Sequence, residues 1–298
     1  MKLLKFDRKA FDDRFGSKKN CYQYLADIKW KNGYKCKRCD DSRYIKGKQP
    51  SSRRCSGCGY DESTTTGTLF HKLKFGIDKA FGMLYEISTS NKGANSVWLA
   101  ERFGVQQNTA WLFRQKVQMA MKSSGNHPLQ EEVHVDEFEI GTPKEGEQGR
   151  SHSDTKMRVV IAIEHRAGKS GRGYAKVITD YSSDSLQPIF DDHIDKKASI
   201  LADGWSGYQP IKEDFPNLSQ ILSDKGRNFK MLHIQIRNFK NWLRGVHSYC
   251  GRENLQKYID EYFFRFNRRN HRTSILDKLI ERAVNCPPMN KKELLLAT

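Results

Sequence analysis

Hydrophobic and polar positions along this chain follow two different periods, separated by a polar stretch at residues 123–128. Before that stretch, apolar side chains recur every three or four positions in residues 20–30 and again in residues 75–121. This spacing predicts amphipathic helices. Breaks at residues 88–94 and 103–105 divide the longer segment, so we expect it to form several helices.

Beyond the polar stretch the pattern changes to the alternation typical of β-strands, in residues 132–140, 157–163 and 173–178. Residues 186–194 return to helical spacing, and residues 199–202 form a short apolar run that ends before an Asp-Gly pair. Three strands, a helix and a further strand predict an antiparallel meander joined to a parallel strand. This is the ribonuclease H-like arrangement.

Residues 96–103, Gly104 and residues 107–118 have the spacing of a helix-turn-helix, whose second helix enters the major groove of DNA. In this interpretation one face of the second helix points toward DNA and the other packs inward. The expected DNA-facing residues are Gln106, Gln107, Asn108 and Arg114, and the expected inward-facing residues are Ala110, Trp111 and Val117. An ordinary helical hairpin has much the same pattern, so both interpretations stay open.

Four cysteines form two close pairs, Cys36 with Cys39 and Cys55 with Cys58. Two such pairs, separated by a hairpin arm at residues 40–54, can close a tetrahedral zinc site. A pair of disulfides is the alternative, but it requires an oxidising compartment, and the first residues lack the apolar stretch of a secretory signal. We therefore predict a structural Zn²⁺ ion bound by four thiolates, with no coordination position left for water.

The chain carries 52 Lys and Arg residues against 35 Asp and Glu residues, a formal net charge of +17. A charge of this size favours a polyanionic partner through the release of counterions. Aromatic residues lie beside the basic ones at residues 30–35 and 264–269, a pattern that also favours nucleic acid. No uninterrupted apolar run approaches the roughly 18 residues of a membrane span. We expect a soluble, cytoplasmic protein that binds double-stranded DNA and no membrane.

Two acidic residues are expected to lie together in the ribonuclease H-like domain. Asp136 lies in the middle of the first strand, and Asp203 follows the fourth. Carboxylates that hold two divalent ions support phosphodiester chemistry, so this pair is the predicted catalytic site. Glu137 and Glu139 are alternatives at the first position, because alternate residues of a strand point to opposite faces and only one set can face the site.

Several short motifs together resemble those of DDE-type transposases of bacterial insertion sequences, in the subgroup whose integrase-like domain follows a zinc ribbon. The motifs are the two cysteine pairs, Trp111, residues 135–137, Gly149 and Arg150, residues 202–208, residues 240–245 and the pattern of residues 255–269. The resemblance extends over residues 20–269. It implies an enzyme that binds the terminal inverted repeats of its element, cleaves DNA with Mg²⁺ or Mn²⁺ and transfers the 3′ end to target DNA. It also implies a homodimer or higher oligomer on DNA.

One position departs from the pattern of this family. Relatives often carry a third acidic residue seven positions before a lysine, and here His233 stands seven positions before Lys240. Seven residues are two helical turns, so the two side chains can share a face. Neutral imidazole binds divalent ions and suits Mn²⁺ or softer metals better than Mg²⁺. Two alternatives stay open: Asn238 as the third ligand, and His233 as a helix-capping residue.

Basic residues near this helix are the expected contacts to the DNA backbone. Lys240 is expected to bind a phosphate near the cut, and the resemblance adds Arg244 from the same motif. Arg268 and Arg269 extend the basic surface.

The expected fold class is a multidomain α+β or α/β protein with a zinc ribbon, a helix-turn-helix segment and a ribonuclease H-like catalytic domain. The expected boundaries are residues 1–67 for the first helix and ribbon, 68–124 for the helix-turn-helix segment, 129–270 for the catalytic domain and 271–298 for a C-terminal tail. Two other functional classes stay open: a non-catalytic DNA-binding regulator derived from a transposase, and a structure-selective nuclease. In each case the protein is expected in the bacterial cytoplasm, at the nucleoid when it is bound to DNA.

Overall fold

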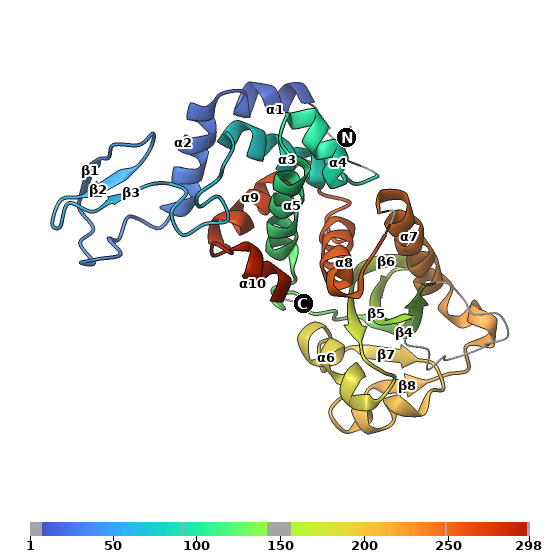
Figure 1. Ribbon diagram of the computed structural model, residues 1–298. Helices are drawn as coiled ribbons and strands as arrows, with labels where there is room; N and C mark the ends of the chain where they lie inside the picture. The colour runs from blue at the N-terminus through green and yellow to red at the C-terminus, as the bar shows by residue number, and fades with distance from the viewer. Residues whose placement is uncertain (1–7, 91, 142–155, 248, 297–298) are drawn as a thin grey trace. The chain divides into compact units, whose positions relative to one another are not determined.

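The computed structural model of the chain describes residues 8–90, 92–141, 156–247 and 249–296 (Figure 1). These residues form two compact units: the first contains residues up to Met121 together with those from Asn270 onward, and the second is Lys122–Arg269. Gly149 and Arg150, which contribute to the family resemblance, lie outside the described residues.

The helices expected in the first part of the chain are confirmed. The elements are α1 (Arg8–Phe15), α2 (Lys18–Lys29), α3 (Ile77–Thr89), α4 (Ser96–Phe103) and α5 (Gln107–Met121). Ser17 starts α2, because its side chain accepts a hydrogen bond from the backbone N–H of Asn20. Gly104 ends α4 in the left-handed conformation, which glycine adopts without a steric cost. The sequence pattern did not predict α1, which is only eight residues long.

The C-terminal residues form two further helices in the first unit, α9 (Ile275–Asn285) and α10 (Lys291–Leu296). Helix α9 contacts α2, α3 and α5. Its Asp277 accepts a 2.7 Å hydrogen bond from the hydroxyl of Tyr24 and pairs with Arg14 at 2.8 Å. The segment 271–298, which we expected as a tail, therefore contains a helix, α9, that belongs to the packed core of this unit. The reason is an apolar face at helical spacing that includes Leu276, Leu279 and Ala283.

Three short antiparallel strands follow α2, in the order β1 (Tyr44–Lys46), β2 (Arg53–Cys55) and β3 (Asp61–Glu62). They confirm the hairpin arm expected between the two cysteine pairs. A small core that contains Trp30 and Tyr34 supports them. Buried Glu62 pairs with Lys29 of α2 at 2.8 Å, which joins the last strand of the ribbon to the helix.

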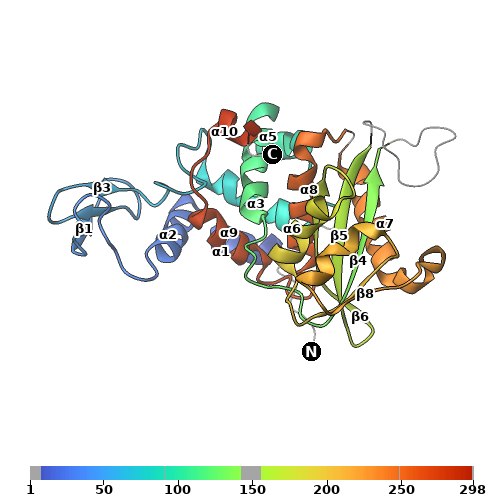
Figure 2. The same ribbon diagram turned by 90° about the horizontal axis from the view of Figure 1, so that it is seen from below.

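The second unit is built on one five-stranded sheet, and Figure 2 shows its strands β4 and β5 side by side. The strands are β4 (Glu132–Ile140), β5 (Met157–Arg166), β6 (Lys169–Ile178), β7 (Ser199–Ala202) and β8 (Leu218–Gln220), in the spatial order β6-β5-β4-β7-β8. The first three pair antiparallel, whereas β7 runs parallel to both β4 and β8. This topology confirms the expected ribonuclease H-like fold. The three-residue strand β8 was not predicted, because it is too short to show alternation.

Helices cover both faces of this sheet. Helix α6 (Ser183–His193) packs on the face that carries Val133 and Val135. Helices α7 (Lys230–Val246) and α8 (Arg252–Phe266) pack on the opposite face, which carries Phe138. Short 3₁₀ helices lie at Ser206–Tyr208, Pro210–Glu213 and Asp224–Phe229.

In the parts of the chain that the structure describes, no helix combines the length and the apolar character needed to span a bilayer.

Candidate active site and zinc centre

The two predicted catalytic aspartates lie side by side on neighbouring parallel strands, Asp136 in the middle of β4 and Asp203 directly after β7. Val135 of β4 pairs with Ala202 of β7, and Asp136 and Asp203 are the next residues of the two strands. Each of Asp136, Glu137 and Asp203 offers a carboxylate oxygen, and these three oxygens lie within 4.8 Å of one another. The structure therefore brings the predicted pair together and adds Glu137, which the sequence offered only as a replacement for Asp136.

A network of hydrogen bonds fixes the loop that carries Asp203. The side chain of Asp203 accepts a 3.0 Å bond from the backbone N–H of Trp205. Gln220, at the end of β8, donates to the carbonyl oxygens of Asp203 at 2.9 Å and Trp205 at 2.7 Å. The indole of Trp205 donates to the carbonyl of Tyr181 at 2.8 Å. Sequence patterns did not reveal Trp205 or Gln220 in this role, because their partners come from separate strands and loops.

Glu137 and Glu139, the two rivals of Asp136, have different surroundings. Burial, and after it the nearby negative charge of Glu137, raise the pKa of Tyr208 well above its usual value. Tyr208 therefore remains protonated in the fold, near the Glu137 carboxylate. Glu139 accepts a 2.8 Å bond from the hydroxyl of Tyr181 and pairs with Lys156 at 3.0 Å. Glu139 thus has structural partners, whereas Glu137 belongs to the carboxylate group.

His233, on the first turn of α7, faces the first aspartate. Its Nε2 lies 3.4 Å from Oδ2 of Asp136, and its side chain is 43% exposed. Partial burial lowers the pKa of His233, which favours the neutral ring that can bind a metal ion. Asn238 follows five residues later, about 140° around the helix, so it points away from the side that carries His233. Of these two residues, His233 is therefore the one on the side of α7 that faces Asp136.

Lys240 lies on the same side of α7 as His233, as its seven-residue spacing predicted. Its ammonium group lies 5.3 Å from the centre of the Phe138 ring, on β4. Burial and the nearby Arg244 lower the pKa of Lys240, while Glu139 opposes this shift. Arg244 is exposed one helical turn further along α7. These two basic side chains give the helix a cationic surface beyond the carboxylate group.

Arg268 and Arg269 contact their own domain more closely than we expected for residues of a DNA surface. The guanidinium of Arg268 lies 3.9 Å from the centre of the Phe264 ring and donates to the Phe264 carbonyl. Arg269 lies 4.0 Å from the centre of the Phe266 ring and donates to the carbonyl of Gly171 at 3.1 Å. The Arg269 bond joins the end of α8 to β6, whereas the Arg268 contacts stay within α8 and its end. Both arginines thus have structural partners.

Helix α5 presents part of the predicted DNA-facing set. Gln106, Gln107 and Asn108 are exposed around its start, while the expected inward residues Ala110 and Val117 are buried and Trp111 is partly buried. Arg114 is only 2% exposed, which contradicts its predicted contact with DNA. It stands four residues after Ala110 and three before Val117, so helical spacing places it on the buried face.

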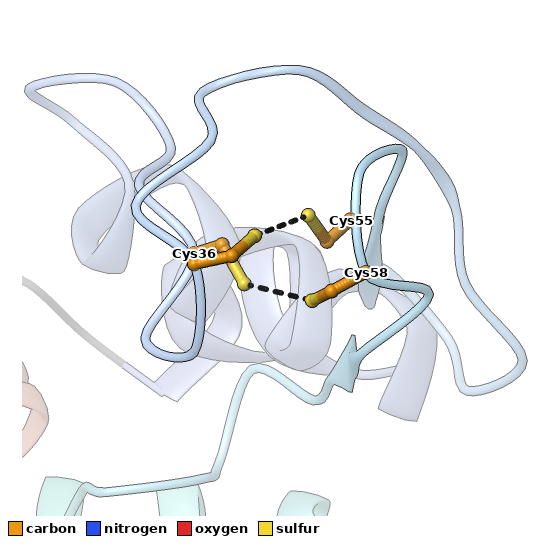
Figure 3. A group of neighbouring side chains, drawn as sticks. Cys36, Cys55 and Cys58 are labelled. Carbon is orange, nitrogen blue, oxygen red and sulfur yellow. Dashed lines mark hydrogen bonds between the residues drawn. The ribbon is translucent and has the colours of Figure 1, made fainter.

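The four cysteines of the ribbon converge as their spacing predicted. The Sγ atoms of Cys36 and Cys58 are 3.6 Å apart, and those of Cys39 and Cys55 are 3.5 Å apart. All four sulfur atoms lie within 4.8 Å of one another, and Figure 3 shows the side chains of Cys36, Cys55 and Cys58 turned toward one another. None forms a disulfide. Four converging thiols are the ligand set of a structural zinc site.

Comparison with known proteins gives the same division into a ribbon and a catalytic domain. Residues 128–267 match the family model for the ISXO2-like transposase domain, and residues 16–61 match that for the transposase zinc-ribbon domain. The chain belongs to the ISXO2-like transposases. The two matched regions together account for more than half of this transposase.

Two individual proteins are also similar to this transposase. One is an uncharacterized protein in transposable element ISH50 of Halobacterium salinarum, which is 23% identical over 217 residues, covering 67% of this chain and 72% of that protein. The other is a chain from the crystal structure of a pre-cleavage Mos1 transpososome, which is 10% identical, with 71% of this chain and 80% of that chain covered and a TM-score of 0.26.

Proposed function

We propose that this transposase binds the terminal inverted repeats of an insertion sequence, cleaves DNA at them and transfers the 3′ ends to target DNA. The observation that supports this function most strongly is the group formed by Asp136, Glu137 and Asp203, whose carboxylate oxygens lie within 4.8 Å of one another. Like charges this close repel one another, so such a group is stable when cations neutralise it. A cation-binding carboxylate group in a transposase domain supports phosphodiester chemistry.

The donor atoms fit Mg²⁺ or Mn²⁺. Both ions prefer oxygen ligands, and the neutral imidazole of His233 adds a nitrogen that favours Mn²⁺. We propose Asp136, Asp203 and His233 as the principal ligands, with Glu137 beside them. Bound there, divalent ions would help to activate the attacking nucleophile and to stabilise the leaving oxygen.

The protein side chains around this group hold it in position. The backbone N–H of Trp205 orients Asp203, and Gln220 of β8 donates to the Asp203 carbonyl. We propose that Lys240 and Arg244 on α7 bind phosphates of the DNA backbone. A fixed arrangement of carboxylates matters because misplacement by about 1 Å can lower the rate of a reaction about 100-fold.

Binding of the element ends is proposed for the first unit. The zinc ribbon and the exposed start of α5, with Gln107 and Asn108, offer polar side chains for contacts to bases. We also propose that the protein acts as a homodimer or higher oligomer on DNA, in the bacterial cytoplasm and at the nucleoid. A two-ended substrate requires at least two end-binding sites, which a symmetric oligomer supplies.

One experiment separates this function from its two alternatives. The purified protein is incubated with Mn²⁺, a target plasmid and labelled DNA that carries the inverted repeats flanking its gene. A transposase cuts at the repeat ends and joins them to the plasmid. Cleavage without joined product would indicate a nuclease, and salt-sensitive binding without cleavage would indicate a regulator.

A further inference from the structure

A second group of potential metal ligands lies on the sheet of the catalytic domain, outside the carboxylate group. Glu132 begins β4 and pairs directly with His165 of β5, and His134 follows two residues after Glu132. Alternate residues of a strand share a face. Glu132 and His134 therefore lie on the face that also carries Asp136 and Phe138.

These side chains are close enough to share an ion. Nε2 of His134 lies 3.0 Å from a carboxylate oxygen of Glu132. The centres of the two imidazole rings, those of His134 and His165, are 3.9 Å apart. One ligand atom from each of the three residues can be chosen so that all lie within 4.8 Å of one another.

Each of the two histidines also has a buried ring nitrogen without a hydrogen-bond partner among the described residues. His134 is only 6% exposed, yet its Nδ1 has no hydrogen-bond partner among the described residues. The same holds for Nε2 of His165, which is also buried from solvent. An unpaired buried nitrogen costs free energy, so its presence calls for a ligand or another compensating contact.

We propose that Glu132, His134 and His165 bind one divalent transition-metal ion of the zinc class. Two imidazole nitrogens and one carboxylate oxygen form a known ligand set for Zn²⁺, with a fourth position left for water. Bonds of about 2.0–2.2 Å place tetrahedral ligand atoms about 3.4 Å apart. His134 and Glu132 are 3.0 Å apart and all three ligand atoms lie within 4.8 Å of one another, so the side chains need to adjust by about 1 Å. Glu132 is free to do so, because its side chain is 50% exposed.

This site is separate from the ribbon and from the carboxylate group. Along β4, Glu132 precedes Asp136 by four residues and His134 precedes it by two, about 13 Å and about 7 Å in an extended strand. The ring of His134 packs edge-on against Phe229, with ring centres 5.3 Å apart, and Phe229 directly precedes α7. An ion here would link β4 to β5 beside the start of the helix that carries His233. We expect it to stabilise this part of the catalytic domain, whether or not the proposed reaction takes place.

The test uses the full chain with Asp136→Asn and Asp203→Asn, so that the carboxylate group does not retain zinc. After dialysis against micromolar Zn²⁺, elemental analysis should give two zinc ions per chain, one of them in the ribbon. Adding Glu132→Gln or His165→Gln should lower the affinity for the second ion at least about tenfold. Glu131→Gln is the matched control, because Glu131 is an adjacent exposed carboxylate outside the group.

Thermal unfolding provides an independent readout that does not depend on activity. The parent is the chain with Asp136→Asn and Asp203→Asn. The second zinc equivalent should raise the unfolding temperature of this parent and of its Glu131→Gln variant, but not that of its Glu132→Gln variant. Glu132→Gln alters a half-exposed side chain, so without zinc it should unfold like the parent. A parent that retains only one zinc would overturn the proposal. Retention of the second ion by both ligand variants, or its loss in Glu131→Gln, would overturn it equally.

Discussion

Replacing Gly207 with alanine should displace the loop that carries Asp203 and thereby slow DNA cleavage. A Cβ atom at position 207 would lie 2.5 Å from the carbonyl oxygen of Tyr181 and 2.6 Å from Nε1 of Trp205. These two atoms are joined by the 2.8 Å hydrogen bond that holds the loop. The added methyl group therefore pushes apart the two partners of that bond.

The structure sets the size of this effect. An ordinary contact to a Cβ atom begins at 3.4 Å, so the Tyr181 backbone or the loop has to move by about 1 Å. Overpacking of this kind costs about 1–3 kcal/mol of stability, and loss of the hydrogen bond adds about 1 kcal/mol. A displacement of about 1 Å at Asp203 should lower the cleavage rate about 100-fold.

Gly204→Ala is the matched control, because it lies in the same loop, next to Asp203, and an added Cβ there meets nothing within 4 Å. Initial cleavage rates are measured on DNA that carries the element ends, in Mn²⁺ at fixed salt, with binding followed separately by gel shift. Gly204→Ala should cleave within a few-fold of the wild-type rate, and both variants should bind DNA normally. If Gly207→Ala cleaves as fast as Gly204→Ala, the loop does not position Asp203 as we infer.

Three further predictions concern metal binding, the third ligand and pH. Cys58→Ser should lose the ribbon zinc and expose the ribbon to proteolysis, because the metal contributes about 10–16 kcal/mol of local folding energy. Zinc-free wild-type protein with an intact ribbon would contradict this prediction. His233→Ala should lose most cleavage activity in Mn²⁺, and His233→Glu should shift the metal preference toward Mg²⁺. Asn238→Ala should lose little cleavage activity. The reverse pattern in rate assays would make Asn238 the ligand. Burial, helped by Lys176, lowers the pKa of His193 to about 4 from its usual 6.5. The stability that its neutral form provides is therefore complete above pH 6.5 and is lost as pH falls toward 4, by up to about 3 kcal/mol. Urea unfolding at a series of pH values should show this loss. In His193→Gln this part of the pH dependence should be absent.

Much of the site follows from spacing along the sequence. Two residues between the cysteines of each pair identify the zinc centre, because that spacing places two thiols on one tight turn. The seven residues between His233 and Lys240 place both on one side of α7, since seven residues are two helical turns. The apolar run before Asp203 predicts a buried strand beside β4. These signals are local, so one sequence suffices to detect them.

Other features depend on tertiary contacts that local patterns do not contain. Gln220 supports the Asp203 loop from β8, a strand too short to show a period. Asp203 comes to Asp136 and Glu137 from a separate strand, so alternation along β4 could not show that Glu137 joins the two aspartates. Arg114 is a different case, because its spacing from Ala110 and Val117 already indicated the buried face. Its charge led to the wrong prediction.

The most direct test of the account is the cleavage of element-end DNA by Asp136→Asn and Asp203→Asn, with binding measured on the same preparations. We predict that each variant lowers metal-dependent cleavage at least about 100-fold and leaves the affinity for DNA within a few-fold of wild type. Glu213→Gln, which removes an exposed carboxylate elsewhere in the catalytic domain, should change neither. Cleavage near the wild-type rate by either aspartate variant would contradict the assignment of this carboxylate group as the active site.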